Sequence, residues 1–90
     1  MPQAIVDPED LRRFAGSLKK FSGEMQERIA SLGAQLSGLE RTWRDQEQKK
    51  FTEEFQQHMK VLARFIEVVD RHIPHLLRKA ETIEEYLRQR

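Results

Sequence analysis

Apolar residues recur every three or four positions through the first half of the chain, the spacing of one face of an α-helix. The pattern predicts a helix over about residues 7–43. Asp7 is placed to cap its first free N–H groups, and Pro8 suits the first helical position. The apolar positions of this stripe are Leu11, Phe14, Leu18, Phe21, Met25, Ile29, Leu32, Leu36, Leu39 and Trp43.

A second stripe of the same spacing begins at Phe51 and predicts a helix over about residues 46–88. This stripe is wider and spans about half of the helix circumference. One neighbouring helix cannot cover so broad an arc, so we expect the apolar excess to be buried against another chain. The residues that widen the stripe are Val61, Phe65, Val68 and Leu77.

Pro74 lies inside the second stripe and interrupts neither its phase nor its spacing. Proline removes one helical hydrogen bond and crowds the preceding turn. We therefore expect a kink near Pro74 in a helix that continues, with a break into a third helix as the alternative.

The two stripes meet at a short turn over about residues 43–46. Asp45 and Gln48 have the spacing of a capping box, which predicts that Asp45 caps the second helix. With two helical stripes, the expected fold is all-α. Because short turns join antiparallel neighbours, the two helices are expected to run antiparallel. The fold is then one antiparallel helical hairpin over residues 1–90 that pairs as a dimer into a four-helix bundle.

The core of the hairpin or of its dimer is expected to hold large apolar side chains from both stripes. These are Leu18, Phe21, Met25, Leu32, Leu36, Leu39, Phe55, Leu62, Phe65, Ile66, Val69 and Ile73. A chain of 90 residues buries a small core, and such chains gain stability from disulfides, metals or assembly. With no cysteine in the sequence, assembly is the expected route.

Composition argues against several other classes of function. The net charge is +1, from 16 basic and 15 acidic residues mixed along the chain, so we expect no nucleic-acid binding. No apolar run approaches the ~20 residues that span a bilayer, so membrane insertion is not expected. The N-terminus lacks a basic start followed by a long apolar stretch, so no cleavable signal peptide is expected.

We also expect no enzymatic activity, cofactor or metal. Two long helices form a seam and not the concave pocket that catalysis needs. The three histidines are His58, His72 and His75, and the last two are separated by Pro74, which disturbs a shared ligand geometry.

The turn carries a resemblance to a known family. Trp43, Arg44 and Asp45, followed by Phe51 in the middle of a chain of about 90 residues, resemble the turn of the WXG100 (ESAT-6-like) family. The family pattern is Trp-X-Gly, and here Asp45 replaces the glycine as a Trp-X-Asp variant. Asp tolerates a positive φ and also caps helices, so the same turn is physically possible.

The resemblance implies a protein that acts through protein–protein contacts, as a type VII-like secretion substrate or adaptor. It implies head-to-tail pairing, and we expect a homodimer, with a heterodimer with a related small helical protein as the alternative. The C-terminal Tyr-X-X-X-Asp/Glu of many exported members is absent, because Arg90 follows Tyr86 at that spacing. The expected location is therefore the cytoplasm, or outside the cell without a cleaved signal.

Two other functions fit a helical hairpin. A Rop-like nucleic-acid-binding dimer would gather basic residues on one exposed face, for which Arg12, Lys19, Lys20 and Arg28 are the candidates. A membrane-surface helix would instead use the broad apolar arc of the second helix.

Overall fold

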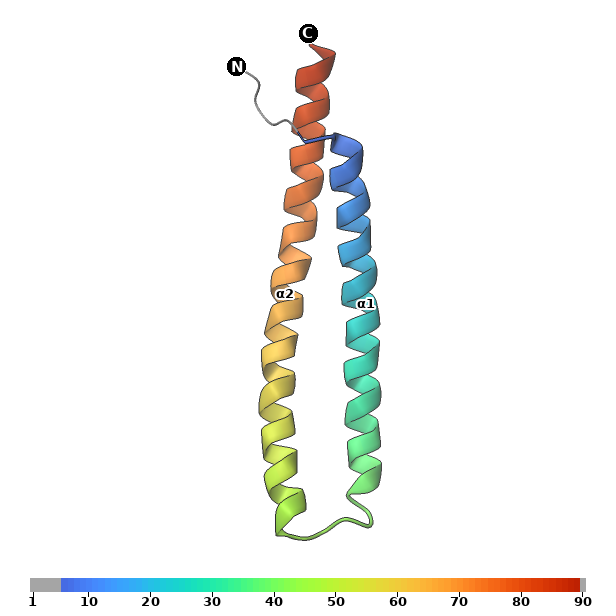
Figure 1. Cartoon of the computed structure of the whole chain (residues 1–90), viewed down its shortest axis with the longest axis vertical. Coiled ribbons are helices and arrows are strands. Elements are labelled where there is room, and N and C mark those ends of the chain that lie inside the picture. Colours follow the sequence, from blue (N-terminus) through green and yellow to red (C-terminus); the bar gives the residue numbers. More distant parts are fainter. Residues whose placement is uncertain (1–5, 90) are drawn as a thin grey trace.

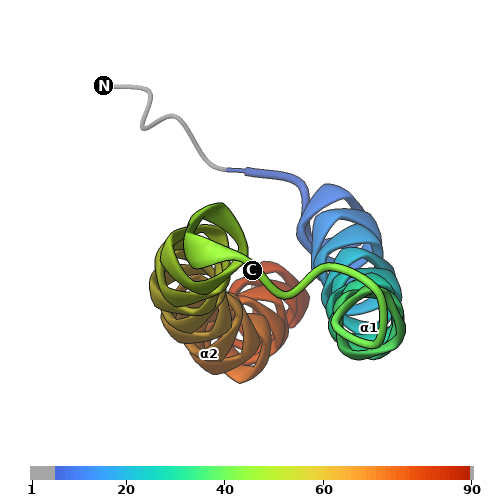
Figure 2. The same ribbon diagram turned by 90° about the horizontal axis from the view of Figure 1, so that it is seen from below.

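The computed structural model describes residues 6–89 as two long antiparallel helices, α1 (Pro8–Leu39) and α2 (Gln46–Arg88). They lie side by side along a molecule of 68 × 21 × 15 Å, and α2 extends past the start of α1 (Figure 1). The end-on view shows these two helices alone, with no further layer on either side (Figure 2). The expected all-α hairpin is therefore confirmed.

Both helices begin at an aspartate that caps them. The Asp7 carboxylate accepts a 2.9 Å hydrogen bond from the Glu9 backbone N–H, and Pro8 occupies the first turn. The Asp45 carboxylate accepts a 3.0 Å hydrogen bond from the Gln48 backbone N–H, so Asp45 is the N-cap of α2. Each cap satisfies one of the N–H groups that the first turn of a helix leaves free.

α1 ends at Leu39, four residues before the predicted end near Trp43. The chain leaves the helix through a tight turn, in which the Thr42 and Trp43 N–H groups both donate to the Leu39 carbonyl. Gly38 weakens the last helical turn, and leaving the helix lets the Trp43 ring meet Phe51 across the connection. The connection therefore covers residues 40–45 and is longer than the predicted turn.

α2 continues through Pro74 without a break, so the described chain contains no separate third helix. Pro74 has no N–H group to donate to the Asp70 carbonyl one turn earlier. The Asp70 side chain has a different partner, because it accepts a 2.6 Å hydrogen bond from Ser22 Oγ on α1.

The seam between the helices is narrow. Its buried apolar residues are Ala15, Ile66, Val69 and Ala80, and Ser22 is the buried polar residue. Of the predicted core, Ile66 and Val69 are buried, while Leu18, Met25, Leu36, Phe55, Leu62 and Ile73 are half-buried. Phe21, Leu32, Leu39 and Phe65 are exposed in the hairpin, because two helices share only one line of contact.

Arg12 and Glu84 join the open end of the hairpin. The Arg12 guanidinium donates two hydrogen bonds, of 2.7 and 2.6 Å, to the two carboxylate oxygens of Glu84. Chiefly through these hydrogen bonds, and despite partial desolvation, the pair holds the pKa of Glu84 below its ordinary value. A group with a lowered pKa in the folded state stabilises the fold above its ordinary pKa and loses that effect as the pH falls through the lowered value.

We therefore expect Glu84→Gln to lower the midpoint of chemical unfolding at about pH 7 and to lower it less at about pH 2, because the stabilisation by the pair is lost as the pH falls. Urea titrations followed by circular dichroism at both pH values check this. Glu85→Gln removes the adjacent exposed carboxylate and is the control. An equal loss at both pH values would show that the ion pair does not cause the effect.

Candidate interaction surface

An apolar face remains open on one side of the seam. On α1 it is formed by Phe14, Phe21, Leu32 and Leu39, which are 39–57% exposed. Their successive spacings of 7, 11 and 7 residues place them on one side of the helix. On α2 it includes Phe51 and Phe65, which are 44% and 52% exposed. We call these six residues the apolar face.

Contacts across the seam join the two halves of the apolar face. The Phe21 and Phe65 rings meet edge to face, with their centroids 6.4 Å apart. Nearer the turn, Leu32, Leu39 and Phe51 line one groove together with Leu36, Phe55 and Gln35. The face is thus continuous over both helices, which is unusual for the exposed surface of a soluble monomer and typical of an interface.

Aromatic rings close the turn end of this face. Trp43 is half-buried, with its ring centroid 5.7 Å from that of Phe51, and Phe51 lies 5.8 Å from Phe55. The three predicted turn residues, Trp43, Asp45 and Phe51, therefore lie at the same end of the hairpin but have different contacts. Trp43 and Phe51 are in contact, and Asp45 caps the helix between them.

Asp45 has a φ of −102° and a ψ of −173°, which is extended backbone that any residue adopts. The turn therefore does not need the positive φ that was considered for this position. We expect Asp45→Ala to lower the stability by about 1 kcal/mol and Asp45→Gly by only a few tenths, because glycine is itself an acceptable N-cap. Thermal unfolding followed by circular dichroism compares the variants, and equal losses would contradict the capping role.

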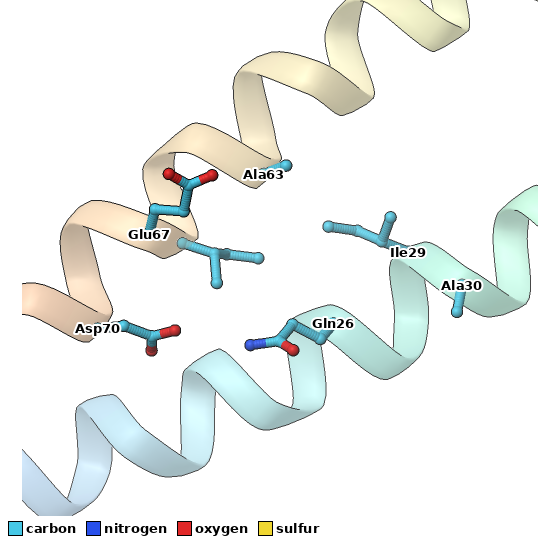
Figure 3. Close-up of a pocket in the computed structure, with 7 residues that line it drawn as sticks. Gln26, Ile29, Ala30, Ala63, Glu67 and Asp70 are labelled. Carbon is cyan, nitrogen blue, oxygen red and sulfur yellow. The ribbon is translucent and has the colours of Figure 1, made fainter.

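The opposite side of the seam has a different chemistry. Gln26, Ile29 and Ala30 of α1 and Ala63, Ile66, Glu67 and Asp70 of α2 line a groove of about 420 Å³ there (Figure 3). Gln26 Nε2 donates a 3.1 Å hydrogen bond to Ser22 Oγ, which donates in turn to Asp70. The sequence analysis did not predict this polar network, because Ser22 lies between the apolar positions Phe21 and Met25 and does not alter their spacing. The large apolar surface therefore lies on one side only.

Three other kinds of site were considered from the sequence, for metal, membrane and nucleic acid. Among residues 6–89, no three side chains of metal-binding type gather around one point. In the same range, neither helix combines the length and apolar character that crossing a membrane requires. Of the basic residues considered for nucleic-acid binding, Arg12 is engaged by Glu84.

Comparisons with known proteins agree with the geometry of the turn and hairpin. The family model WXG100, proteins of 100 residues with WXG, matches residues 3–86. Members of this family form dimers. A search among curated proteins found no match.

Crystal structures of EsxB, a secreted protein from Bacillus anthracis strain Sterne, share the fold. The wild-type protein is 32% identical, with a TM-score of 0.78 over 91% of this chain and 88% of EsxB. The selenomethionine form is 30% identical, with a TM-score of 0.79 over 96% and 98%. A point variant is 30% identical, with a TM-score of 0.83 over 94% and 96%. The match of the family model over most of the chain and these likenesses show that the chain belongs to the WXG100 family.

Proposed function

We propose that this chain works as a homodimer that buries the apolar face and serves a type VII-like secretion system as a substrate or adaptor. The observation that carries the proposal is the apolar face itself, six large side chains on one side of a hairpin whose own seam buries four apolar residues, of which two are alanine. A second copy supplies the same surface, so an isologous contact covers both faces at once.

In this dimer the predicted core is completed between the two chains. Phe21, Leu32, Leu39 and Phe65 join the half-buried residues of the seam in a four-helix bundle. Full burial of a large apolar side chain contributes roughly 1.5–3 kcal/mol. These four are 39–52% exposed in the hairpin, so the dimer adds about half of that for each, which is still substantial beside the stability of a small domain. Trp43 and Phe51 close the end of the bundle, and no catalytic role is proposed for any residue.

The proposed link to secretion is supported by family membership and by the likeness to EsxB, itself a secreted protein. The Rop-like alternative gains no support from the comparisons, and none is proposed here.

Light scattering after size exclusion, over a range of protein concentrations, tests the dimer. The expected mass is twice the chain mass of 10.7 kDa, with high helicity by circular dichroism. A poorly helical monomer would instead favour a heterodimer, in which a different chain covers the apolar face. Immunoblots of culture supernatants, from host cells with and without a type VII secretion ATPase, test export independently.

A further inference from the structure

The part of the apolar face on α1 is symmetrical along the helix. Phe14, Phe21, Leu32 and Leu39 are separated by 7, 11 and 7 residues. The midpoint of Phe14 and Leu39 therefore falls between residues 26 and 27, and the midpoint of Phe21 and Leu32 falls at the same place. A second α1 that runs antiparallel across this point places Phe14 against Leu39 and Phe21 against Leu32, once in each direction.

α2 has a matching symmetry, and here it includes charge. Glu54 and Lys79 are both exposed, and the midpoint between them falls between residues 66 and 67. The midpoint of Phe51 and the half-buried Ile83 is residue 67. Antiparallel pairing of two α2 helices across this point therefore places Glu54 of each copy against Lys79 of the other, and Phe51 against Ile83.

Both charged side chains lie at the edge of the apolar face. At about 100° per residue, Glu54 and Lys79 are turned about 20° and 40° from Phe65, in both cases away from the seam. The edge of an interface suits ion pairs, because charges there stay partly in water and need not be fully desolvated.

Neither charge has an ion-pair partner within the described chain. The salt bridges among residues 6–89 all involve Arg12 or Arg13, so Glu54 makes none with Lys50, one turn before it. Lys79 has no acid three or four residues away on α2, where the side chains are His75, Leu76, Thr82 and Ile83.

The midpoints on the two helices lie at the same height across the seam. Gln26 of α1 and Glu67 of α2 line one groove (Figure 3), and Ser22 Oγ one turn away donates to Asp70. One two-fold axis, at right angles to the helices and between the two apolar faces, therefore satisfies α1 and α2 together. An axis parallel to the helices would stack α1 on α2 and leave Glu54 and Lys79 apart.

We propose that Glu54 of each copy pairs with Lys79 of the other, and that these two ion pairs fix the register of the homodimer proposed above, on which this inference rests. Opposite charges at an interface select and orient the partner. A second copy carries both charges at the required spacing by symmetry, so the pattern selects the chain itself.

Charge reversal in the full chain tests the pairing. E54K or K79E alone brings like charges together at both ends of the contact. The dissociation constant, from light scattering over a concentration series, is expected to rise at least about tenfold. E54K/K79E in one chain restores both ion pairs with reversed signs and should regain the dissociation constant of the parent.

A mixture of E54K and K79E tests the symmetry directly. Each contact between the two variants joins one basic and one acidic side chain, so the mixed dimer should exceed its random share. Native mass spectrometry, with an affinity tag on one variant, measures that share. E53K and K60E make the same changes at exposed positions turned about 120° and 140° from Phe65, and they should dimerise as the parent does and mix at random.

The outcomes separate this pairing from the homodimer itself. A dimeric parent whose E54K and K79E variants keep its dissociation constant and mix at random would overturn the ion pairs and leave the homodimer standing. Failure of E54K/K79E to recover, with helicity by circular dichroism equal to that of the parent, would also overturn them. A monomeric parent would overturn both.

Discussion

Phe65→Glu is expected to convert the dimer into a monomer, with the mass by light scattering falling to 10.7 kDa. Phe65 is 52% exposed in the hairpin and contacts Phe21 at the middle of the apolar face. In each chain the substitution removes about half of the roughly 1.5–3 kcal/mol of full burial, and it leaves a carboxylate to be desolvated in its place. The dissociation constant should therefore rise by at least about a hundredfold.

Ala63→Glu is the matched control, because it places the same charge two residues away in the groove on the other side of the seam. That variant should keep the mass of the parent. Circular dichroism at the same concentrations reports whether the Phe65→Glu monomer stays helical. A Phe65→Glu protein with an unchanged mass would mean that the chains pair through another surface.

Ala80→Leu is expected to lower the free energy of unfolding by about 1–3 kcal/mol, as overpacking of a tight contact does. Ala80 is 0% exposed and Ala15 on α1 is 1% exposed. Both lie near the Arg12–Glu84 pair, so small side chains allow the helices to approach closely at this end. A leucine adds three carbon atoms for which the seam has no room.

Urea unfolding at one fixed protein concentration measures the effect. Ala34→Leu makes the same replacement at an exposed position of α1 and should change stability by no more than about 0.5 kcal/mol. If Ala80→Leu matched that control, the close approach of the helices at the open end would be refuted.

The periodicity of the sequence predicted the two helices and their order, because apolar residues spaced by three and four positions over a long segment fit a helix and do not fit a strand. The caps at Asp7 and Asp45 were also predictable, since an aspartate just before a helix can accept a hydrogen bond from a free backbone N–H group of the first turn. The end of α1 was not, because Trp43 keeps the helical spacing although it lies beyond the helix. An apolar residue that packs across a turn can prolong a stripe past the last helical residue.

The interaction surfaces were only partly predictable. The stripes treat Leu18 and Phe21 alike, yet Leu18 is half-buried at the seam and Phe21 is exposed beside it. Which side of a broad stripe faces the neighbouring helix depends on the packing of both helices. Ala15, Ser22 and Ala80 are too small or too polar to stand out in an apolar pattern.

The antiparallel arrangement also sets the order in which the hairpin closes. Trp43 and Phe51 meet across eight residues, whereas Arg12 and Glu84 are separated by 72. Because the entropy lost on closing a loop grows with its length, contacts at the turn end form first. Contacts then form one after another toward the Arg12–Glu84 pair at the open end. Opening runs in reverse, so backbone amides near Pro8 and Arg88 should exchange with solvent before those near the turn. The ends of the chain would then be the first parts presented in extended form to any machinery that pulls on the protein.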